Sequence, residues 1–263
     1  MTAHPDPAAD NVLQRFRLDG RVAVVTGGGT GIGRAIALGL ADAGADVVVA
    51  GRRAEPLDAV VAELSARGRR GLAVATDVTI EADVLRLAEA AAAFGPLRAW
   101  VNNAGGLQGE PMGTLRDTTP ESWHTTIDRN LTSVFLCASV ALALMEDGGA
   151  VLNLSSTATA TRGAPGHGPY SAAKFALNHL TQTMAFELAP RRIRVNAIAP
   201  GHTQTADYER TSGFTDAQFA KLASKQPLGR IGADHDFAAA AVYFCSDASS
   251  WVTGQTLFVS GTP

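Results

Sequence analysis

The sequence has few cysteines and no excess of basic charge. Its 263 residues contain two cysteines, Cys137 and Cys245, and neither belongs to a C-x-x-C or Cys/His spacing. This pattern excludes a disulfide framework and a zinc finger, and it favours a reduced, metal-free, cytoplasmic protein. Lys and Arg number 22 against 25 Asp and Glu, a formal net charge of −3. Because nucleic-acid binding needs a basic excess, a nucleic-acid partner is disfavoured.

The chain also lacks an uninterrupted apolar run of membrane-spanning length. The longest such stretch, Leu131 to Met145, contains three Ser or Thr residues and is shorter than the roughly 20 residues that a spanning helix requires. We therefore expect no membrane segment. Residues 1–15 have neither a basic start nor an apolar run, so we expect a disordered leader rather than a signal peptide. Residues 16–263 show no hinge and are expected to form one domain.

Short Val-rich runs alternate with longer Ala-rich segments along the chain, which is typical of parallel strands joined by crossover helices. This alternation predicts a Rossmann-like, doubly wound α/β fold, with a seven-stranded, mostly parallel sheet flanked by helices on both faces. The expected strands are residues 21–26, 46–51, 71–76, 97–102, 150–155, 193–199 and 256–260. The expected helices are residues 31–43, 56–67, 80–94 and 170–188, with a shorter one near 214–224.

A glycine-rich turn, Thr26 to Gly33, follows the first expected strand and precedes a helix. Glycines let backbone amides approach a pyrophosphate, whose charge is favoured at a helix amino terminus. The spacing is that of Gly27, Gly31 and Gly33, which differs from the G-x-G-x-x-G of longer-chain dehydrogenases. The turn predicts dinucleotide binding, with Thr30 and Ile32 among the residues in contact.

The end of the second strand indicates which dinucleotide is bound. A carboxylate there would bond the ribose hydroxyls of NAD and repel a 2′-phosphate, but the run is Gly51-Arg52-Arg53. Arg52 can contact that phosphate through two charged hydrogen bonds, and Arg53 flanks it, so NADP(H) is favoured over NAD(H). Two solvated arginines are the alternative. Asp77 and Val78 follow the third strand, where Asp77 either accepts from the adenine amino group or caps a helix.

Tyr170 and Lys174 lie four residues apart, so on a helix they share one face. A free tyrosine has a pKa near 10, and a nearby ammonium group and an oxidised nicotinamide would stabilise its phenolate. Lowering that pKa by about three units needs roughly 4 kcal/mol. We therefore predict that Tyr170 is the acid/base of a hydride-transfer reaction between a carbonyl and a secondary alcohol, with Ser156 holding the carbonyl oxygen.

In order, the motifs Thr26 to Gly33, Asn102-Asn103-Ala104-Gly105, Asn130, Ser155-Ser156, Tyr170-x-x-x-Lys174 and Pro200-Gly201 resemble those of the short-chain dehydrogenase/reductase family. The resemblance runs from about residue 20 to the end. It implies that Asn130 anchors, through its backbone, a water that links Lys174 to solvent, and that Lys174 contacts the nicotinamide ribose. It also places Asn103, Ala104, Gly105, Pro200, Gly201, Thr203 and Thr205 around the cofactor.

One departure concerns the serine, because Ser156 lies one residue farther from Tyr170 than is usual in the family. Ser155 and Thr157 are the rival hydroxyls; Ser155 should point to the other face of the strand end, and Thr157 has the usual separation. Ser156 is preferred because it follows Asn153-Leu154-Ser155 as in the family.

Three other functions compete with carbonyl reduction. Ser171 to Lys174 also reads as the S-x-x-K of acyl-transfer enzymes, but the S-D-N and K-T-G partners are absent. A reductase of enoyl-thioester C=C bonds is the second, and a non-catalytic NADP-binding sensor, which would have lost Tyr170 or Lys174, is the third.

The substrate is a small molecule that the sequence describes only coarsely. Tyr208, Phe214 and Phe219 favour a medium-sized, largely apolar ketone or alcohol, and His167, His202 and Tyr208 are polar candidates around it. The family resemblance implies a homotetramer, or a homodimer, in which the helix at 131–145 and the helix after Tyr170 pair across a two-fold axis.

Overall fold

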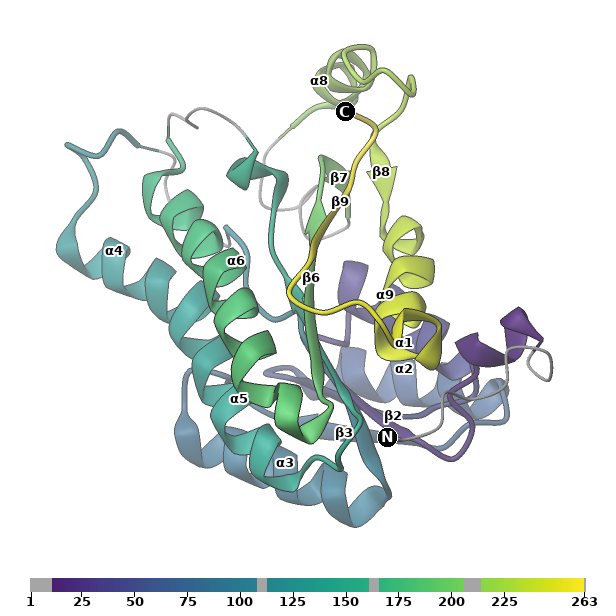
Figure 1. Ribbon diagram of the computed structural model, residues 1–263. Helices are drawn as coiled ribbons and strands as arrows, with labels where there is room; N and C mark the ends of the chain where they lie inside the picture. The colour runs from purple at the N-terminus through teal and green to yellow at the C-terminus, as the bar shows by residue number, and fades with distance from the viewer. Residues whose placement is uncertain (1–10, 108–112, 161–165, 206–213, 263) are drawn as a thin grey trace.

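A parallel sheet of seven strands forms the centre of the computed structural model, which describes residues 11–107, 113–160, 166–205 and 214–262 (Figure 1). The strand order is β3-β2-β1-β4-β5-β6-β9, and the chain reverses its direction of travel across the sheet between β1 and β4. This order confirms the predicted doubly wound fold. The strands are β1 Val22–Thr26, β2 Asp46–Gly51, β3 Gly71–Ala75, β4 Leu97–Asn102, β5 Ala150–Leu154, β6 Arg194–Pro200 and β9 Thr256–Val259.

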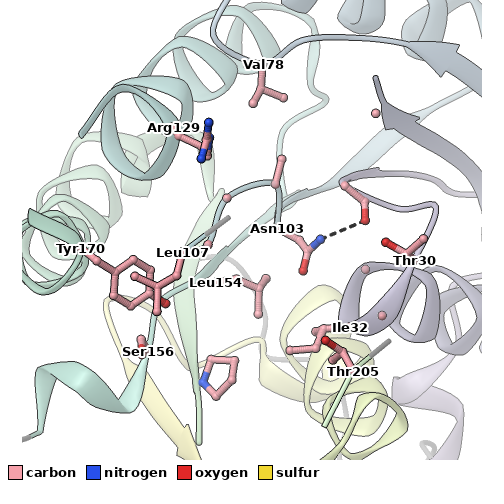
Figure 2. Close-up of a pocket in the computed structure, with 18 of the residues that line it drawn as sticks. Thr30, Ile32, Val78, Asn103, Leu107, Arg129, Leu154, Ser156, Tyr170 and Thr205 are labelled. Atoms are coloured by element: carbon pink, nitrogen blue, oxygen red, sulfur yellow. Dashed lines mark hydrogen bonds between the residues drawn. The ribbon is translucent and has the colours of Figure 1, made fainter. Parts of the chain in front are cut away.

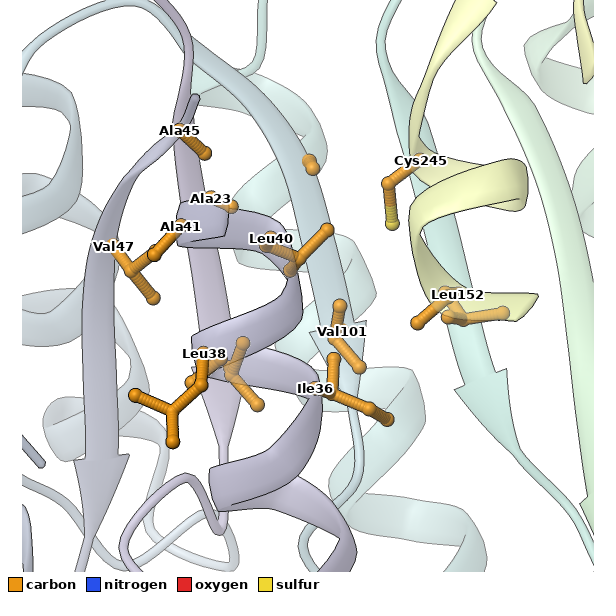
Figure 3. Close-up of a cluster of buried hydrophobic side chains, with 14 of the residues drawn as sticks. Ala23, Ile36, Leu38, Leu40, Ala41, Ala45, Val47, Val101, Leu152 and Cys245 are labelled. Atoms are coloured by element: carbon orange, nitrogen blue, oxygen red, sulfur yellow. The ribbon is translucent and has the colours of Figure 1, made fainter. Parts of the chain in front are cut away.

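Helices cover both faces of the sheet, as expected from the buried, Val-rich strands. One face carries α1 Gly31–Asp42, α2 Ala54–Ala66 and α9 Ala238–Cys245, and the other carries α3 Glu81–Phe94, α5 Ser133–Leu144 and α6 Gly168–Leu188. Each face of the sheet carries its own hydrophobic core, because side chains alternate between the two faces along a strand. In strand β1, Ala23 and Val25 belong to the first core, on the side of α1, while Val22 and Val24 belong to the second core, on the side of α3. In the first core, Ile36 of α1 lies beside Val101 of β4 (Figure 3).

The two cysteines are free and buried, Cys245 in the first core and Cys137 in the second. Burial raises the pKa of each thiol to about 12, so both behave as small apolar side chains.

The longest helical run is longer than the sequence predicted. Helix α4, Pro120–Ile127, continues through a π-helical turn, η2 Asp128–Thr132, into α5, so that 25 residues from Pro120 to Leu144 form one rod. By length and composition this rod could cross a membrane, and the expectation that it is too short was wrong. Core helices of soluble proteins pass the same test, and here α5 packs against α3 while α4 packs against α6.

Smaller elements complete the fold around the carboxyl end of the sheet. Two two-residue strands, β7 Thr203–Gln204 and β8 Gly232–Ala233, pair in parallel, and α8 spans Asp216–Ala223 after a capping box formed by Thr215 and Gln218. The sequence predicted α8 but neither short strand. Single turns of 3-10 helix are η1 Val12–Phe16, η3 Thr157–Thr159, η4 Ala189–Arg191, η5 Asp234–Phe237 and η6 Asp247–Ser249.

Residues 11–15, which the sequence analysis assigned to a leader, belong to a helical turn that packs on the domain. Residues Val12–Phe16 form η1, capped by the Asn11 side chain, and the Phe16 ring packs on Tyr243 at 6.2 Å between centroids. Arg15 also donates to the Ser250 hydroxyl at 2.9 Å. These contacts tie the segment to the domain, and residues 1–10 lie outside the described part of the chain.

Candidate active site

A cleft of about 1360 Å³ lies beyond the carboxyl ends of β1, β2, β4, β5 and β6 (Figure 2). In a doubly wound sheet this is where ligands bind, next to the point at which the strand order reverses. Its volume exceeds the roughly 300–1,000 Å³ of a typical single-ligand pocket, so it has room for a dinucleotide together with a substrate. Every site residue that the sequence predicts, except Asn130, lines this cleft.

The glycine-rich turn forms one wall of the cleft. Gly27 and Gly31 have φ values of +64° and +51°, a conformation that other residues rarely adopt. A Cβ on Gly33 would lie 2.1 Å from the Gly27 carbonyl oxygen, so no larger residue fits there. Thr30 is the N-cap of α1 but makes no side-chain cap bond, and it lies with Ile32 on the cleft wall. The first amides of α1 therefore face a cradle suited to a phosphate.

Asn103 holds this turn against β4. Its Nδ2 donates to the carbonyl of Thr26 at 2.9 Å and to that of Gly27 at 3.2 Å. Figure 2 marks a hydrogen bond of the Asn103 side chain with a dashed line. The amides of Asn103 and Ala104 both donate to the Thr26 hydroxyl, at 3.0 and 3.1 Å. The side chain of Asn103 is thus occupied within the protein, which leaves its backbone and those of Ala104 and Gly105 to line the cleft.

Behind this turn a buried polar chain links three elements. The Trp100 indole donates to Asn102 at 2.9 Å, Asn102 donates to Asn153 at 2.9 Å, and Asn153 donates to the hydroxyl of Thr181 at 2.9 Å. Because buried amides are costly when unpaired, this fully bonded chain fixes β4, β5 and α6 in one register. Asn102, the first residue of the Asn102-Asn103-Ala104-Gly105 motif, therefore joins β4 to β5.

The end of β2 presents positive charge to the cleft. Gly51, Arg52 and Arg53 all line it, and a Cβ on Gly51 would meet only Leu57, at 3.6 Å. Asp77 faces this region: its pKa is lowered by hydrogen bonds from Thr79 and by Arg52, against the opposing effect of burial. Asp77 Oδ1 accepts both the amide and the hydroxyl of Thr79, so Asp77 forms a local turn, while Val78 forms part of the neighbouring wall.

Ser156, Tyr170 and Lys174 meet at the end of β5. The Tyr170 hydroxyl forms a hydrogen bond with the Ser156 side chain, whose Oγ also accepts from the Ala158 amide at 3.1 Å. The Lys174 ammonium lies 5.7 Å from the centre of the Tyr170 ring and donates to the Leu154 carbonyl at 2.7 Å. Of the three candidate hydroxyls, Ser156 is the one bonded to Tyr170.

The pKa of Tyr170 differs from the expectation. Burial raises it, and the hydrogen bond with Ser156 lowers it by a smaller amount. Burial also lowers the pKa of Lys174 to about 8. The expected lowering by Lys174 is therefore absent from the protein alone: burial of the phenol sets the direction of the pKa, and the hydrogen bond with Ser156 is what opposes it. At neutral pH the Tyr170 phenol keeps its proton.

Asn130 lies in the π-helical turn, directly behind the cleft. Its Oδ1 accepts from the Gly106 amide at 2.8 Å, and its Nδ2 donates to the carbonyls of Gly106 at 3.1 Å and Thr126 at 3.0 Å. A π turn shifts the backbone bonds by one residue, and side chains satisfy the carbonyls released: Asn130 bonds Thr126, and the Ser133 hydroxyl bonds Arg129 at 2.8 Å. Asn130 is fully buried and holds the 105–106 loop in place.

The segment after β6 forms the remaining wall. Pro200, Gly201, Thr203 and Thr205 all line the cleft, and Thr205 lies 3.5 Å from the position of a Cβ on Gly31. The Thr203 hydroxyl donates to the Gly201 carbonyl at 2.9 Å. Among the polar candidates for the substrate side, His167 and His202 line the cleft, and Tyr208 lies outside the described residues. Phe214 and Phe219 pack on one another, 5.6 Å between ring centres.

Several cleft residues carry no sequence signal that marks them. Leu107, Arg129 and Leu136 belong to the loop after β4 and to the long helical rod, and Ala158 lies in η3. Arg129 and Leu136 line the cleft because the rod from Pro120 to Leu144 runs along it, and no motif encodes that packing. Among the described residues, no group of three or more His, Cys, Asp or Glu is placed to hold a metal ion.

Two observations test whether a nicotinamide dinucleotide fits the cleft. A Cβ on Gly31 would meet only Thr205, at 3.5 Å, so the turn leaves space beside the amino terminus of α1. In addition, Ser155 lines the cleft, and its buried hydroxyl has no hydrogen-bond partner among the described residues. A buried hydroxyl without a partner is costly, so a ligand polar group there would be favourable. The residues present fit such a cofactor.

Comparison with known proteins agrees with this geometry. Residues 27–261 match the family model described as Enoyl-(Acyl carrier protein) reductase. The chain is 42% identical to the cis-4-hydroxycyclohexanecarboxylate dehydrogenase of Sinomonas cyclohexanicum, over 92% of this chain and 95% of the relative. It is 37% identical to the 7alpha-hydroxysteroid dehydrogenase of Escherichia coli, over 94% of this chain and 95% of the relative.

Solved structures show the same relation. A 7α-hydroxysteroid dehydrogenase complexed with NADH and 7-oxo glycochenodeoxycholic acid matches with a TM-score of 0.87 at 37% identity. The match covers 94% of this chain and 96% of that one. A short-chain type dehydrogenase/reductase from Mycobacterium marinum also matches with a TM-score of 0.87, at 34% identity, over 95% of this chain and 98% of the other.

Proposed function

Because the chain belongs to the short-chain dehydrogenase/reductase family, we propose that it is an NADP(H)-dependent enzyme that interconverts a carbonyl and a secondary alcohol. The observation that carries the proposal is the meeting of Tyr170 with Ser156 and Lys174 inside a cleft that fits a dinucleotide. This constellation places a proton donor, a hydroxyl that binds oxygen and a cationic group around one point.

The roles follow from the contacts. When bound, the nicotinamide supplies or accepts a hydride at the substrate carbon. The Tyr170 phenol, protonated at neutral pH because its pKa is raised, donates its proton to the carbonyl oxygen during reduction. Ser156 hydrogen-bonds the same oxygen and holds it against Tyr170. Lys174 is still largely charged at pH 7 and, from its bond to the Leu154 carbonyl, stabilises the phenolate as the proton leaves.

The cofactor would lie along the cleft from the end of β2 to Tyr170. Gly27, Thr30, Gly31, Ile32 and Gly33 would hold the pyrophosphate, and Asp77, Val78 and the backbone of 103–105 would flank the adenosine and nicotinamide halves. Pro200, Gly201, Thr203 and Thr205 would close the opposite side, and Lys174 would contact the nicotinamide ribose. Asn130, which does not line the cleft, would act from behind it through its hold on Gly106.

Preference for NADP(H) rests on charge at the end of β2. Arg52 and Arg53 line the cleft there, Gly51 leaves space beside them, and the strand tip carries no carboxylate. A 2′-phosphate would gain charge-assisted hydrogen bonds from Arg52 that a ribose hydroxyl cannot match. The relative solved with NADH shows the cofactor class of the family, whereas the choice between the two cofactors depends on these residues of this chain.

The relatives support a cyclic secondary alcohol, or the matching ketone, as the substrate. One is named for a hydroxycyclohexane carboxylate and another for a hydroxysteroid. We further propose a cytoplasmic homotetramer, or homodimer, because α5 and α6 expose apolar side chains that a second copy would cover. These include Phe135 of α5 and Phe175 and Phe186 of α6, which are 57%, 50% and 84% exposed. Light scattering after size exclusion would test the assembly.

Reduction of an enoyl-thioester C=C bond is the second candidate, because the matching family model carries the description of an enoyl reductase. The bond between Tyr170 and Ser156 favours carbonyl chemistry instead, since a C=C bond offers no oxygen at the reacting carbon for the two hydroxyls to hold.

The test measures NADPH consumption with cyclic ketones, including 4-oxocyclohexanecarboxylate, with open-chain ketones and aldehydes, and with enoyl thioesters, and NADH is run in parallel. A ketone should turn over, NADPH should be preferred, and Tyr170→Phe should lower kcat by about 10²- to 10⁴-fold. Tyr243→Phe is the matched control, since Tyr243 packs on Phe16 away from the cleft. Enoyl reduction that survives in Tyr170→Phe would favour the second candidate, and a preference for NADH would refute the role of Arg52.

A further inference from the structure

The segment after β5 meets one face of α6 at several points. Tyr170, Lys174 and Asn178 are spaced by four residues, so they follow one face of that helix. Lys174 donates to the carbonyl of Leu154, the last residue of β5, and the Tyr170 hydroxyl bonds Ser156, which caps η3. Asn178, one helical turn beyond Lys174, bonds η3 itself. The helix that carries the proposed acid/base therefore also holds the turn that Ser156 begins.

The contact between Asn178 and η3 passes through Thr159. The Asn178 Nδ2 donates to the Thr159 hydroxyl at 3.2 Å, and that hydroxyl donates to the Ser156 carbonyl at 2.8 Å. A hydroxyl has a single proton, so donation to the Ser156 carbonyl leaves the Thr159 oxygen to accept from Asn178. Thr159 is buried, so little water competes for these bonds. Two consecutive hydrogen bonds thus join α6 to the main chain of Ser156.

Thr159 also closes η3 around the Ser156 side chain. Its amide donates to the Ser156 carbonyl at 3.1 Å, and the Ala158 amide donates to the Ser156 Oγ at 3.1 Å. The turn has three residues, and a single helical turn is unstable without tertiary contacts. The bonds that hold Thr159 therefore stabilise the turn, and the turn sets the direction in which the Ser156 Oγ points.

The Asn178 amide contributes little net stability. Its Oδ1 is buried and has no hydrogen-bond partner among the described residues. A buried acceptor without a partner costs about as much free energy as a hydrogen bond gains, so this cost offsets the bond from Nδ2 to Thr159. A leucine at this position would avoid the cost and lose only that bond. The measurable effect of the amide is thus expected on the orientation of Ser156 rather than on the free energy of unfolding.

We propose that Thr159 and Asn178 are positioning residues, which clamp η3 against α6 so that the Ser156 hydroxyl stays directed at Tyr170. The inference rests on the proposed function, because the proposed reaction uses this hydroxyl. Neither Thr159 nor Asn178 lines the cleft, so both act through Ser156. This η3 clamp sets the position of Ser156 by hydrogen bonds to α6, whatever the number of residues between Ser156 and Tyr170.

The test measures kcat for NADPH-dependent reduction of 4-oxocyclohexanecarboxylate and of cyclohexanone. Thr159→Val removes both hydroxyl bonds and keeps the shape of the side chain, Thr159→Ser restores the hydroxyl, and Asn178→Leu removes the amide. Thr183→Val is the matched control, because Thr183 is exposed on α6 and its hydroxyl bonds the His179 carbonyl of the same helix at 3.3 Å. Ser156→Ala, alone and combined with Thr159→Val, shows whether the effect passes through Ser156.

We expect Thr159→Val and Asn178→Leu to lower kcat by about tenfold, as for one misdirected hydrogen bond, and to leave the KM for NADPH unchanged. Thr159→Ser should recover most of the wild-type kcat. In the Ser156→Ala background, Thr159→Val should change kcat by less than about twofold, because the hydroxyl that it misdirects is already absent. A tenfold loss in both backgrounds, or the wild-type kcat in Thr159→Val or Asn178→Leu, would overturn the inference.

A second measurement needs no substrate. The pKa of Tyr170 is raised by burial and lowered by the hydrogen bond with Ser156, so loss of that bond should raise the pKa further. Fluorine NMR of the cofactor-free protein labelled with fluorotyrosine follows this titration, and Tyr170→Phe assigns the signal. Fluorine makes the phenol more acidic, which brings the titration to lower pH. Lys174 is the charged neighbour of the phenol, and every variant retains it.

The two measurements separate the η3 clamp from the proposed function. Thr159→Val and Asn178→Leu should raise the pKa of Tyr170, as Ser156→Ala does, and Thr183→Val should leave it unchanged. That result, with no turnover of any ketone by NADPH, would refute the reaction and retain the clamp. Turnover that is lost in Tyr170→Phe, with a Tyr170 pKa that Thr159→Val leaves unchanged, would retain the reaction and refute the clamp.

Discussion

Replacing Lys174 with Met is expected to stabilise the protein near neutral pH and to remove part of the pH dependence of its stability. Lys174 is 5% exposed, and burial lowers its pKa from 10.5 to about 8. The unfolded chain therefore binds this proton more tightly than the folded one. At 1.36 kcal/mol per pH unit, the buried charge costs about 3 kcal/mol of folding free energy below pH 8. That cost disappears as the pH rises from about 8 to 10.5.

The hydrogen bond of Lys174 opposes this gain. The Nζ donates to the Leu154 carbonyl at 2.7 Å, and methionine cannot donate there. Losing that bond costs about 1 kcal/mol, so the net gain of Lys174→Met at pH 7 is about 2 kcal/mol. Loss of this bond changes the free energy of unfolding of the variant by the same amount at every pH. The difference in slope thus reports the charge alone: between pH 7 and 10 the wild type should gain about 2.5 kcal/mol relative to the variant.

Urea unfolding of the cofactor-free protein, followed by circular dichroism between pH 7 and 10, measures both quantities. Lys221→Met is the control, because Lys221 is exposed on α8 and should show no such difference. Parallel curves for the wild type and Lys174→Met would refute the buried charge. A variant less stable than the wild type by several kcal/mol at pH 7 would show that the Leu154 bond, rather than desolvation, dominates.

Three further substitutions test the cofactor cradle and its support. Arg52→Ala should raise the KM for NADPH by about 10- to 100-fold and leave the KM for NADH unchanged. Arg86→Ala is the control, because Arg86 is exposed on α3 and its loss should change neither KM. An equal rise of KM for both cofactors would contradict the phosphate contact. Gly33→Ala would place a Cβ 2.1 Å from the Gly27 carbonyl oxygen, so the Kd for NADP⁺ measured by fluorescence should rise; an unchanged Kd would show that the turn can move. Asn130→Ala should lower the free energy of unfolding by about 3 kcal/mol in urea, because the three hydrogen bonds of this fully buried side chain are lost, and a loss below 1 kcal/mol would refute its structural role.

The sequence predicted the seven-stranded sheet well because its strands are buried on both faces. Val22 to Val25 and Val47 to Ala50 form apolar runs bounded by polar or glycine residues, a signal that local reading detects. Strands β7 and β8 have two residues each and no periodicity, so they could not be found. The sequence analysis found only the apolar part of the rod from Pro120 to Leu144. The polar residues in the middle of the rod lie in the π turn, and they make hydrogen bonds that only the fold creates.

The sequence predicted which residues form the site better than it predicted their pKa values. Motif spacing identified Tyr170 and Lys174, and the structure brings them together as the helical period requires. The direction of the Tyr170 pKa was missed, because it depends on how completely α6 and β5 exclude water from the phenol, which has no local signal. Cleft residues such as Arg129 and Ala158 were missed for the same reason: their position comes from packing between distant elements.

The choice among Ser155, Ser156 and Thr157 shows where sequence spacing reaches its limit. Adjacent side chains at a strand end point in opposite directions, so a shift of one residue changes which hydroxyl points toward Tyr170. Ser156 caps η3, and the capped turn directs its Oγ to the Ala158 amide and the Tyr170 hydroxyl together. Thr157 lies within that turn, and Ser155 keeps a buried hydroxyl without a partner. The capped turn, rather than the count of residues to Tyr170, therefore selects Ser156 as the proposed catalytic hydroxyl and leaves Ser155 available to a ligand.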